Sequence, residues 1–167
     1  MAISEGSCRF GLWFFIVRWK ENQVHQARFS TTGIPGSVPA AITRYFAGMS
    51  CGTEPLVSIA VSQEGLFGAI YREVTQIPYG ETVTYGEIAR RTGTHARVVG
   101  LAMKRNITPV LIPCHRVLAA KNIGGFTPSL DIKRDLLALE SGVIRKNKRN
   151  IKITEYPLTN DSLTGEP

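Results

Sequence analysis

The stretch "ETVTYGEIARRTGTHARVVGLAMKRN", residues 81–106, decides how the second half of the chain folds. Thr84 and Glu87 stand three residues apart before an apolar residue, which is the signature of a capping box, so we expect a helix over 85–93. A second helix is expected over 95–104. Two short helices joined by a turn that contains glycine are typical of a helix-turn-helix, although an ordinary helical hairpin in a core shares the pattern.

The second of these helices is basic. Arg97, Lys104 and Arg105 would give it a cationic surface. The whole chain of 167 residues carries 20 Lys and Arg against 13 Asp and Glu, a net charge of +7. This balance suits a polyanionic partner, with nucleic acid as the leading case and an anionic membrane surface second.

Apolar residues at helical spacing predict two further helices in this half. One begins near residue 63 and ends at Pro78-Tyr79-Gly80, which breaks the pattern. The other runs over 130–141, with Ser129 as its N-cap and Gly142 as its stop. Their inward faces are predicted to carry Phe67, Ile70, Tyr71, Val74 and Ile77 in the first helix, and Ile132, Leu136, Leu137 and Leu139 in the second.

The N-terminal third is predicted to hold β structure followed by a helix. Residues 10–19 and 23–30 are rich in aromatic and branched side chains and are expected to form a hairpin. A short helix should follow, with Ser37 as its N-cap and Gly48 just past its end. Residues 55–61 are expected to be a last strand or a linker into a second unit.

The stretch "LIPCHRV", residues 111–117, sets a cysteine beside a histidine in an apolar run. Free cysteine is often a small core side chain, and that interpretation stays open for Cys114. The thiolate is the reactive form of cysteine, and His115 could take the thiol proton directly or through water. A third group usually orients such a base, and Glu140 in the last helix is the candidate. The residues therefore predict a reactive thiol near a DNA-binding module.

The composition argues against several kinds of site. Three cysteines, Cys8, Cys51 and Cys114, include no Cys-x-x-Cys pair, so we expect neither a disulfide framework nor a zinc site, even with His25 added. A reducing cytosol fits this usage best. The apolar run "GLWFFIV" is far shorter than the roughly 20 residues that span a bilayer, so we expect no membrane anchor.

Four motifs resemble one known family. "IPYGETVTYGEIA" (77–89), "ARVVGLAMKRN" (96–106), "IPCHRV" (112–117) and "LLALESG" (136–142) are similar, in order and in spacing, to the O6-alkylguanine-DNA alkyltransferases, also called methylated-DNA--protein-cysteine methyltransferases. The resemblance covers residues 63–142, roughly half of the chain. The N-terminal third resembles the family only in its general layout.

The resemblance implies an α+β fold and a DNA-repair reaction. Residues 1–60 would form an RNase H-like N-terminal domain, and 61–146 a winged-helix-like C-terminal domain that carries the helix-turn-helix. Residues 147–167 would be a basic and then mobile tail. The partner would be double-stranded DNA that contains O6-alkylguanine, bound through its minor groove with the damaged base flipped out. The protein would take the alkyl group onto its own cysteine once, without metal or organic cofactor, as a cytoplasmic monomer.

The resemblance also implies roles for individual residues. Cys114 would be the nucleophile, His115 its base and Glu140 the group that orients the base, while Tyr85 would protonate guanine N3. Arg97 would fill the space of the flipped nucleotide. The substrate pocket would be formed by Asn106, Val117, Phe126 and Thr127, and the DNA-binding surface by Thr84, Gly86, Thr94, Ala96, Gly100, Lys104 and Arg97.

This sequence departs from the family pattern at two places in the pocket. Phe126 stands where many relatives have tyrosine, and Pro128-Ser129 stands where they have a Gly-Gly pair. Two other functions would also fit part of this sequence pattern. One is a non-catalytic alkyltransferase-like protein that only binds lesions, against which the presence of Cys114 argues. The other is a helix-turn-helix regulator with a redox thiol, for which the sequence contains no ligand domain.

Overall fold

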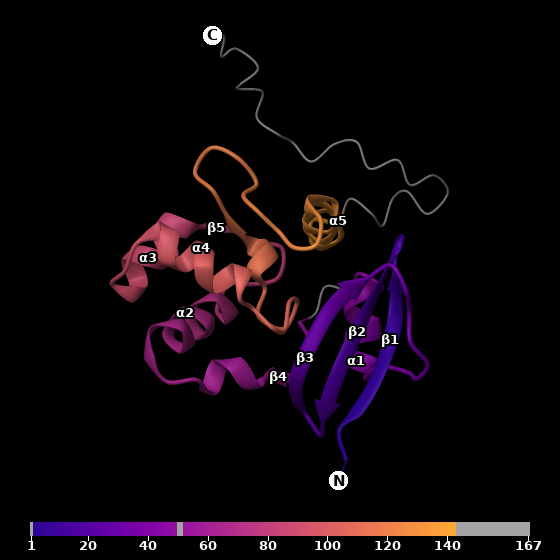
Figure 1. Ribbon diagram of the computed structural model, residues 1–167. Coiled ribbons are helices and arrows are strands. Elements are labelled where there is room, and N and C mark those ends of the chain that lie inside the picture. The colour runs from indigo at the N-terminus through magenta and orange to yellow at the C-terminus, as the bar shows by residue number, and fades with distance from the viewer. Residues whose placement is uncertain (1, 50–51, 143–167) are drawn as a thin grey trace.

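The N-terminal region forms a sheet, as its aromatic and branched residues predict. In the computed structural model, which describes residues 2–49 and 52–142, β1 (Ser4–Phe10), β2 (Trp13–Lys20) and β3 (Gln23–Ser30) are antiparallel neighbours (Figure 1). The short β4 (Val57–Ser58) pairs with β3 in parallel. The sheet order is β1-β2-β3-β4.

The predicted hairpin is present, but one strand was missed. We expected a single strand over 10–19, whereas β1 ends at Phe10 and β2 begins at Trp13. The β1 segment "SEGSCRF" has no branched apolar residue, so it lacks the usual strand pattern. It forms a strand because its backbone pairs with β2 from Ser4 opposite Trp19 to Phe10 opposite Trp13.

The helix α1 (Ala40–Phe46) starts later than predicted. Its N-cap is Pro39, without a side-chain cap, so the assignment of Ser37 as N-cap is wrong. Ser37 belongs instead to a loop that lies against β1, where a Cβ on Gly6 would come within 2.3 Å of the Ser37 carbonyl oxygen. Gly48 just past the helix has a φ of 69°, which fits its predicted position at the C-terminal end.

The helix-turn-helix is confirmed. A 3₁₀ turn, η1 (Ile59–Ser62), leads into α2 (Gly65–Thr75), followed by α3 (Tyr85–Thr92) and α4 (Ala96–Lys104). The Thr84 hydroxyl accepts a hydrogen bond from the Glu87 amide at 3.2 Å, as the capping signature predicts. Gly93 has a left-handed φ of 67°, the conformation that ends α3 and opens the turn.

The rest of the chain adds a second, two-stranded sheet and a last helix. A 3₁₀ turn, η2 (Cys114–Arg116), is followed by β6 (Val117–Leu118), which pairs in parallel with β5 (Val83–Thr84). The last helix is α5 (Leu130–Glu140), and Ser129 caps it as predicted. The predicted tail over 147–167 lies outside the residues that the structure describes, as does Cys51.

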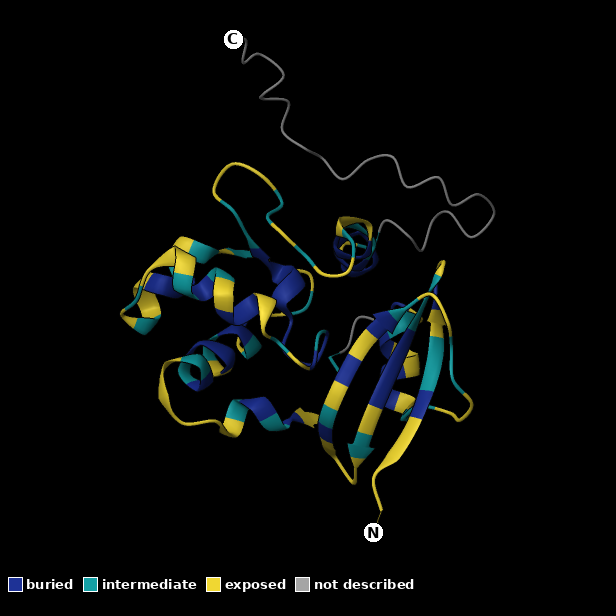
Figure 2. Ribbon diagram, in the orientation of Figure 1, coloured by how far each residue is buried: buried dark blue, intermediate teal, exposed yellow. Residues whose placement is uncertain are grey.

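Two hydrophobic cores organise the described residues (Figure 2). The first combines the sheet and α1 with the buried face of α5, and the second lies among α2, α3, α4 and the segment 112–117. The two are tied by backbone and side chain, since the Ala27 amide donates to the Ile107 carbonyl at 2.8 Å and the Ser58 and Thr108 hydroxyls are 2.6 Å apart. The turn with Cys114 therefore lies at the junction of the two cores.

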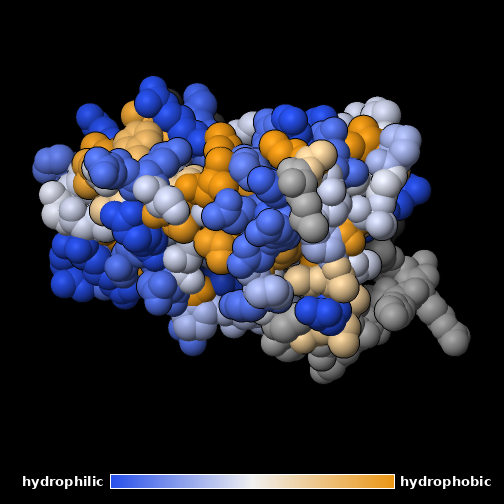
Figure 3. Space-filling model, turned by 90° about the horizontal axis from the view of Figure 1, so that it is seen from below, coloured by the Kyte–Doolittle hydropathy of each residue, from blue (hydrophilic) through white to orange (hydrophobic). Residues whose placement is uncertain are grey.

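Apolar side chains on the surface lie in scattered groups. Figure 3 shows a face dominated by hydrophilic residues with separate apolar spots. Among the residues that the structure describes, the most exposed large apolar side chain is Leu12, in the turn between β1 and β2. Within the described ranges, no helix combines the length and the apolar character needed to cross a membrane.

Candidate active site

The short turn η2 presents Cys114 to a cavity. Pro113 precedes the turn, and its carbonyl accepts a hydrogen bond from the Arg116 amide at 2.9 Å, while the Cys114 amide donates to Ile112 at 2.7 Å. Cys114 is 6% exposed, and it lines a cavity of about 620 Å³. The thiol is thus withdrawn from bulk solvent and still reachable from the cavity.

Both cores contribute to the cavity wall. The helix-turn-helix supplies Tyr85, Gly100, Met103 and Lys104, with Asn106 just beyond it, and the loop before α5 supplies Gly124, Gly125, Phe126, Thr127 and Pro128. The strand β3 contributes a further part of the wall with Ala27, Arg28 and Phe29, which the sequence did not predict. Val117, by contrast, is not part of the wall: it is fully buried, and its carbonyl accepts a hydrogen bond from Lys133 at 2.7 Å.

Asn106 ties the end of α4 to the turn before the cysteine. Its amide nitrogen donates to the Ile112 carbonyl at 2.9 Å, and its amide oxygen accepts from the Thr108 backbone at 2.9 Å. Burial raises the pKa of Cys114, and the Asn106 side chain and then the charge of Lys133 act in the opposite direction. Because burial prevails, the resting thiol is protonated at neutral pH and needs a base.

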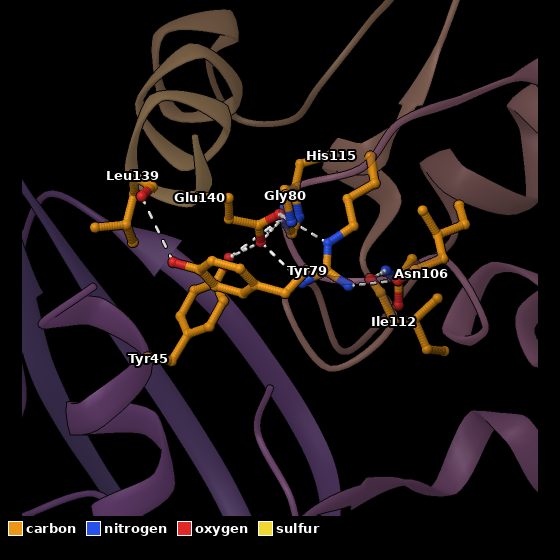
Figure 4. Close-up of polar contacts among 10 residues, drawn as sticks. Tyr45, Tyr79, Gly80, Asn106, Ile112, His115, Leu139 and Glu140 are labelled. Carbon is orange, nitrogen blue, oxygen red and sulfur yellow. Dashed lines mark hydrogen bonds and ion pairs between the residues drawn. The ribbon is translucent and has the colours of Figure 1, made fainter. Parts of the chain in front are cut away.

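Glu140 is the centre of a buried polar cluster (Figure 4). One carboxylate oxygen, Oε1, lies 2.7 Å from His115 Nε2 and accepts hydrogen bonds from the Tyr45 hydroxyl at 2.5 Å and Arg116 Nη2 at 2.9 Å. The other, Oε2, accepts from Arg116 Nε at 2.8 Å and from the Gly80 amide at 3.2 Å. The structure thus brings together the predicted pair of His115 and Glu140.

Burial and charge settle the protonation of this pair. Burial alone would raise the pKa of Glu140, but the hydrogen bonds from His115 and Arg116 and the charge of Arg116 outweigh it and hold the pKa well below its usual range. For His115 burial is the largest effect and lowers its pKa, so the imidazole is neutral at neutral pH. The ionised carboxylate can only accept, so the single imidazole proton lies on Nε2.

The other ring nitrogen of His115, Nδ1, is buried and makes no hydrogen bond to the described residues. With the proton on Nε2, Nδ1 carries a lone pair in a residue that directly follows Cys114. A buried acceptor without a partner costs free energy. A role in accepting a proton, which this geometry allows, would explain why the protein keeps one here.

Tyr85 reaches the cavity from the first turn of α3. Burial raises the pKa of its hydroxyl, with the charge of Cys114 as the second cause, so the phenol is protonated and can donate. Gly124 packs against its ring: a Cβ at that position would lie 2.9 Å from Tyr85 Cε2. Gly124 also has a φ of 77°, a conformation that favours glycine.

Lys133 belongs to the site but was not predicted from the sequence. This side chain is fully buried, and its ammonium donates to the carbonyls of Val117 at 2.7 Å and Gly125 at 3.2 Å. Burial lowers its pKa to about 8, while the charge of Cys114 acts in the opposite direction. One signal could have revealed it: Lys133 precedes Leu136, Leu137 and Glu140 at helical spacing, so it falls on the inward face of α5.

Tyr45 was missed as well. It belongs to α1, 95 residues before the glutamate that it contacts. Its apolar environment in the first core gives the ordinary pattern of a buried aromatic residue. Only the tertiary structure reveals its hydroxyl in the cluster around Glu140.

The predicted DNA-binding residues are all at least partly exposed. Arg97, Ala96 and Lys104 on α4 are exposed, and so are Thr84 and Gly86 at the start of α3. Thr94 and Gly100 are partly exposed, and a Cβ on Gly100 would meet nothing within 4 Å. The adjacent Val99 packs inward and is fully buried, and the exposed residues of α4 are Ala96, Arg97, Leu101 and Lys104. Across the described part of the chain, no group of three or more His, Cys, Asp and Glu could hold a metal ion.

The second half of this chain matches a known family of proteins. The DNA-binding domain of 6-O-methylguanine DNA methyltransferase matches residues 66–142. A methylated-DNA--protein-cysteine methyltransferase from Methanopyrus kandleri is 40% identical over 107 residues, which cover 64% of this chain and 81% of that protein. The chain belongs to the methylated-DNA--protein-cysteine methyltransferase family.

Other members of this methyltransferase family agree with the assignment. The protein of that name from Metallosphaera sedula is 45% identical over 46% of this chain and 49% of its own length. The crystal structure of the Mycobacterium tuberculosis O6-methylguanine methyltransferase superposes with a TM-score of 0.70 at 25% identity, over 84% of this chain and 94% of that one. The mixed α+β fold is therefore that of the family, and the match over 66–142 contains Cys114, His115 and Glu140.

Proposed function

We propose that this protein repairs DNA by transferring the alkyl group of O6-alkylguanine to its own Cys114, once per molecule. The observation that carries the proposal is the pairing of a buried thiol on a cavity wall with a neutral histidine whose Nδ1 is free and whose Nε2 faces Glu140. The relatives named as methylated-DNA--protein-cysteine methyltransferases support the same reaction.

Proton removal comes first. His115 accepts the thiol proton at Nδ1, directly or through one water, and becomes an imidazolium. Glu140 stabilises that cation, because its carboxylate is ionised and lies 2.7 Å from Nε2. The positive charge of Lys133 favours the thiolate that results.

Alkyl transfer then follows by in-line displacement. The thiolate of Cys114 attacks the alkyl carbon, the new S–C bond forms as the C–O6 bond breaks, and the bonding electrons pass to guanine. The Tyr85 hydroxyl donates a proton to guanine N3, which makes the base a better leaving group. The product is S-alkylcysteine, whose sulfur is a poor leaving group, so the protein is consumed. No step requires a metal or an organic cofactor.

DNA would bind across the open side of the helix-turn-helix. The exposed residues Arg97, Ala96 and Gly100 suit close approach of α4 to a minor groove, and a planar guanidinium at 97 can occupy the space of a flipped base. The cavity would take the flipped guanine, with Asn106 holding the cysteine turn and Phe126 and Thr127 closing over the base. The M. tuberculosis relative has been crystallised in complex with DNA.

The finer architecture and setting are part of the same proposal. Residues 1–60 would be an RNase H-like domain and 61–146 a winged-helix-like domain, which the α+β fold and the helix-turn-helix support. The protein would act as a monomer in the cytoplasm.

Mass spectrometry tests the reaction directly. The protein is incubated with duplex DNA that contains O6-methylguanine, and any added methyl group is mapped to a residue. We expect one methyl group on Cys114, and Cys114→Ala should bind the duplex and gain none. Arg97→Ala should weaken DNA binding or base flipping while the fold is kept. Folded protein that binds the lesion without modification of Cys114 would instead be a lesion-binding protein.

A further inference from the structure

Tyr45 connects the first core to the proposed catalytic pair. The residue is 1% exposed, and its hydroxyl donates to Glu140 Oε1 at 2.5 Å and lies 3.2 Å from His115 Nε2 (Figure 4). The three residues come from α1, α5 and η2. A neutral donor thus shares the same carboxylate oxygen with the histidine.

We propose that Tyr45 is a positioning residue for alkyl transfer, because it fixes His115 with its proton on Nε2 and so keeps Nδ1 free to accept the thiol proton. The inference deepens the proposed function and rests on it for its effect on the rate. The state of His115 itself can be measured without any reaction.

The contacts admit one neutral tautomer. Tyr45 gives its only proton to Glu140, so its oxygen can still accept a hydrogen bond from His115 Nε2–H. The alternative tautomer would turn an unprotonated Nε2 toward a carboxylate oxygen and a phenol oxygen, both of which would then be acceptors. That arrangement leaves the two oxygens facing a lone pair and is disfavoured.

The phenol also limits how strongly Glu140 attracts a proton to His115. A hydrogen bond from Tyr45 draws negative charge from the carboxylate, and removing it makes the carboxylate a stronger partner for imidazolium. An imidazolium cannot take the thiol proton. The charged and titratable groups around His115 are Glu140 and Lys133 from α5, Arg116 and Cys114 from η2, Tyr45 from α1, and Tyr79 from the segment after α2.

Packing by Tyr45 is the alternative explanation. Its ring meets Phe46 at a centroid distance of 5.2 Å and Tyr79 at 5.9 Å, both nearly edge-on. A role limited to packing would lower the folding stability, and it would change the transfer rate by the same factor at every pH. A positioning role changes the pH dependence, which separates the two.

Tyr45→Phe tests the proposal, with Ile42→Val as the matched control. Each variant removes one buried heavy atom from α1, and the aliphatic Ile42 side chain has no atom that could hydrogen-bond Glu140 or His115. The rate of single-turnover methyl transfer from O6-methylguanine DNA is measured at about six pH values between about pH 5.5 and about pH 8.5. In the pH–rate profile, the midpoint of the rise in transfer rate on the acid side should lie about one pH unit higher for Tyr45→Phe than for the wild type. Below that midpoint Tyr45→Phe should be about ten-fold slower than the wild type, and near pH 8.5 the two rates should agree.

Nitrogen NMR of the His115 ring gives the readout that needs no substrate. The wild type and Ile42→Val should show neutral imidazole with the proton on Nε2 at pH 7, and Tyr45→Phe should show a larger fraction of imidazolium. The proposal is overturned if His115 titrates alike in all three proteins, or if Tyr45→Phe is slower by one factor at every pH. Absence of transfer by the wild type would refute the proposed function, and the NMR titration would still decide the role of Tyr45.

Discussion

The two hydrophobic cores differ in what fills them. The first is aromatic: Phe46 lies 4.9 Å from Phe10 and 5.1 Å from Phe15 between ring centroids. The second is mostly aliphatic and contains Cys114. The proposed nucleophile thus belongs to the core beneath the helix-turn-helix, whereas the tyrosine and the carboxylate proposed to orient its base come from elements packed in the first core. Chemistry at the junction depends on the two cores staying together.

The buried charges concentrate at this junction. His115, Arg116, Lys133 and Glu140 are all buried, and each has a hydrogen-bond partner. Removing one partner from such a group leaves the other charge uncompensated, which is costly. The junction is therefore where a single substitution should affect folding and chemistry together, unlike a substitution inside either core.

Glu140→Gln should have the largest effect. The amide keeps the shape but leaves Arg116 as an uncompensated buried charge, so we expect a loss of about 3–5 kcal/mol in the free energy of unfolding. Transfer should also slow by more than about 100-fold, since the imidazolium loses its partner. Urea unfolding and single-turnover assays measure both, with the exposed Glu81→Gln as control.

The same variant has a signature in acid. Because the folded pKa of Glu140 is depressed, its contribution is present above its unfolded pKa and is lost as pH falls below that value. The stability difference between the wild type and Glu140→Gln should therefore shrink on acidification. A difference that stays constant down to pH 3 would contradict the assignment of the buried carboxylate.

Local signals explain which parts of this fold the sequence predicts. The Thr84 cap and the left-handed Gly93 act within a few residues, so the helix-turn-helix follows from its own sequence. The strand β1 was missed because its pairing with β2, and not its side chains, makes it a strand. Within the site, Cys114 and His115 stand out as neighbours in the sequence.

The remainder of the site depends on distant contacts. Tyr45 meets His115 across 70 residues and Glu140 across 95, and no periodicity encodes either contact. The contribution of β3 to the cavity wall also depends on distant contacts. Arg28 is an exposed strand residue, and nothing in its local sequence indicates that it lines a cavity. Composition and spacing thus predict the nucleophile and its helix-turn-helix, while the groups that tune them emerge only when the two cores meet.

Lys133→Met should have the next largest effect, and it should depend on pH. The folded pKa of Lys133 is about 8, below its unfolded value, so the folded state binds fewer protons than the unfolded state above pH 8. The contribution of this lysine to stability therefore rises from about pH 8 to 10.5, by at most about 3 kcal/mol. Urea unfolding at pH 7, 8.5 and 10 measures the difference between the two proteins.

The thiol gives a second measurement on the same variant. The charge of Lys133 acts to lower the pKa of Cys114, so its removal should shift alkylation of the thiol by iodoacetamide to higher pH. The Cys114→Ala variant identifies the signal from this cysteine. An unchanged alkylation profile together with a stability gap that does not vary with pH would show that the ammonium does not act on the thiol.

Gly124→Ala should have the smallest effect on stability and a selective effect on transfer. The φ of 77° strains alanine by about 1 kcal/mol, and the added Cβ would come 2.9 Å from Tyr85 Cε2 and displace the ring. A proton donor moved by about 1 Å can cost on the order of 100-fold in rate, so we expect slower transfer by about 10- to 100-fold. Gly65→Ala is the control, because Gly65 has a φ of 79° and a Cβ there meets nothing within 4 Å. Both variants should lose similar stability in urea, and only Gly124→Ala should slow methyl transfer; equal rates would mean that the Tyr85 hydroxyl has no part in the departure of guanine.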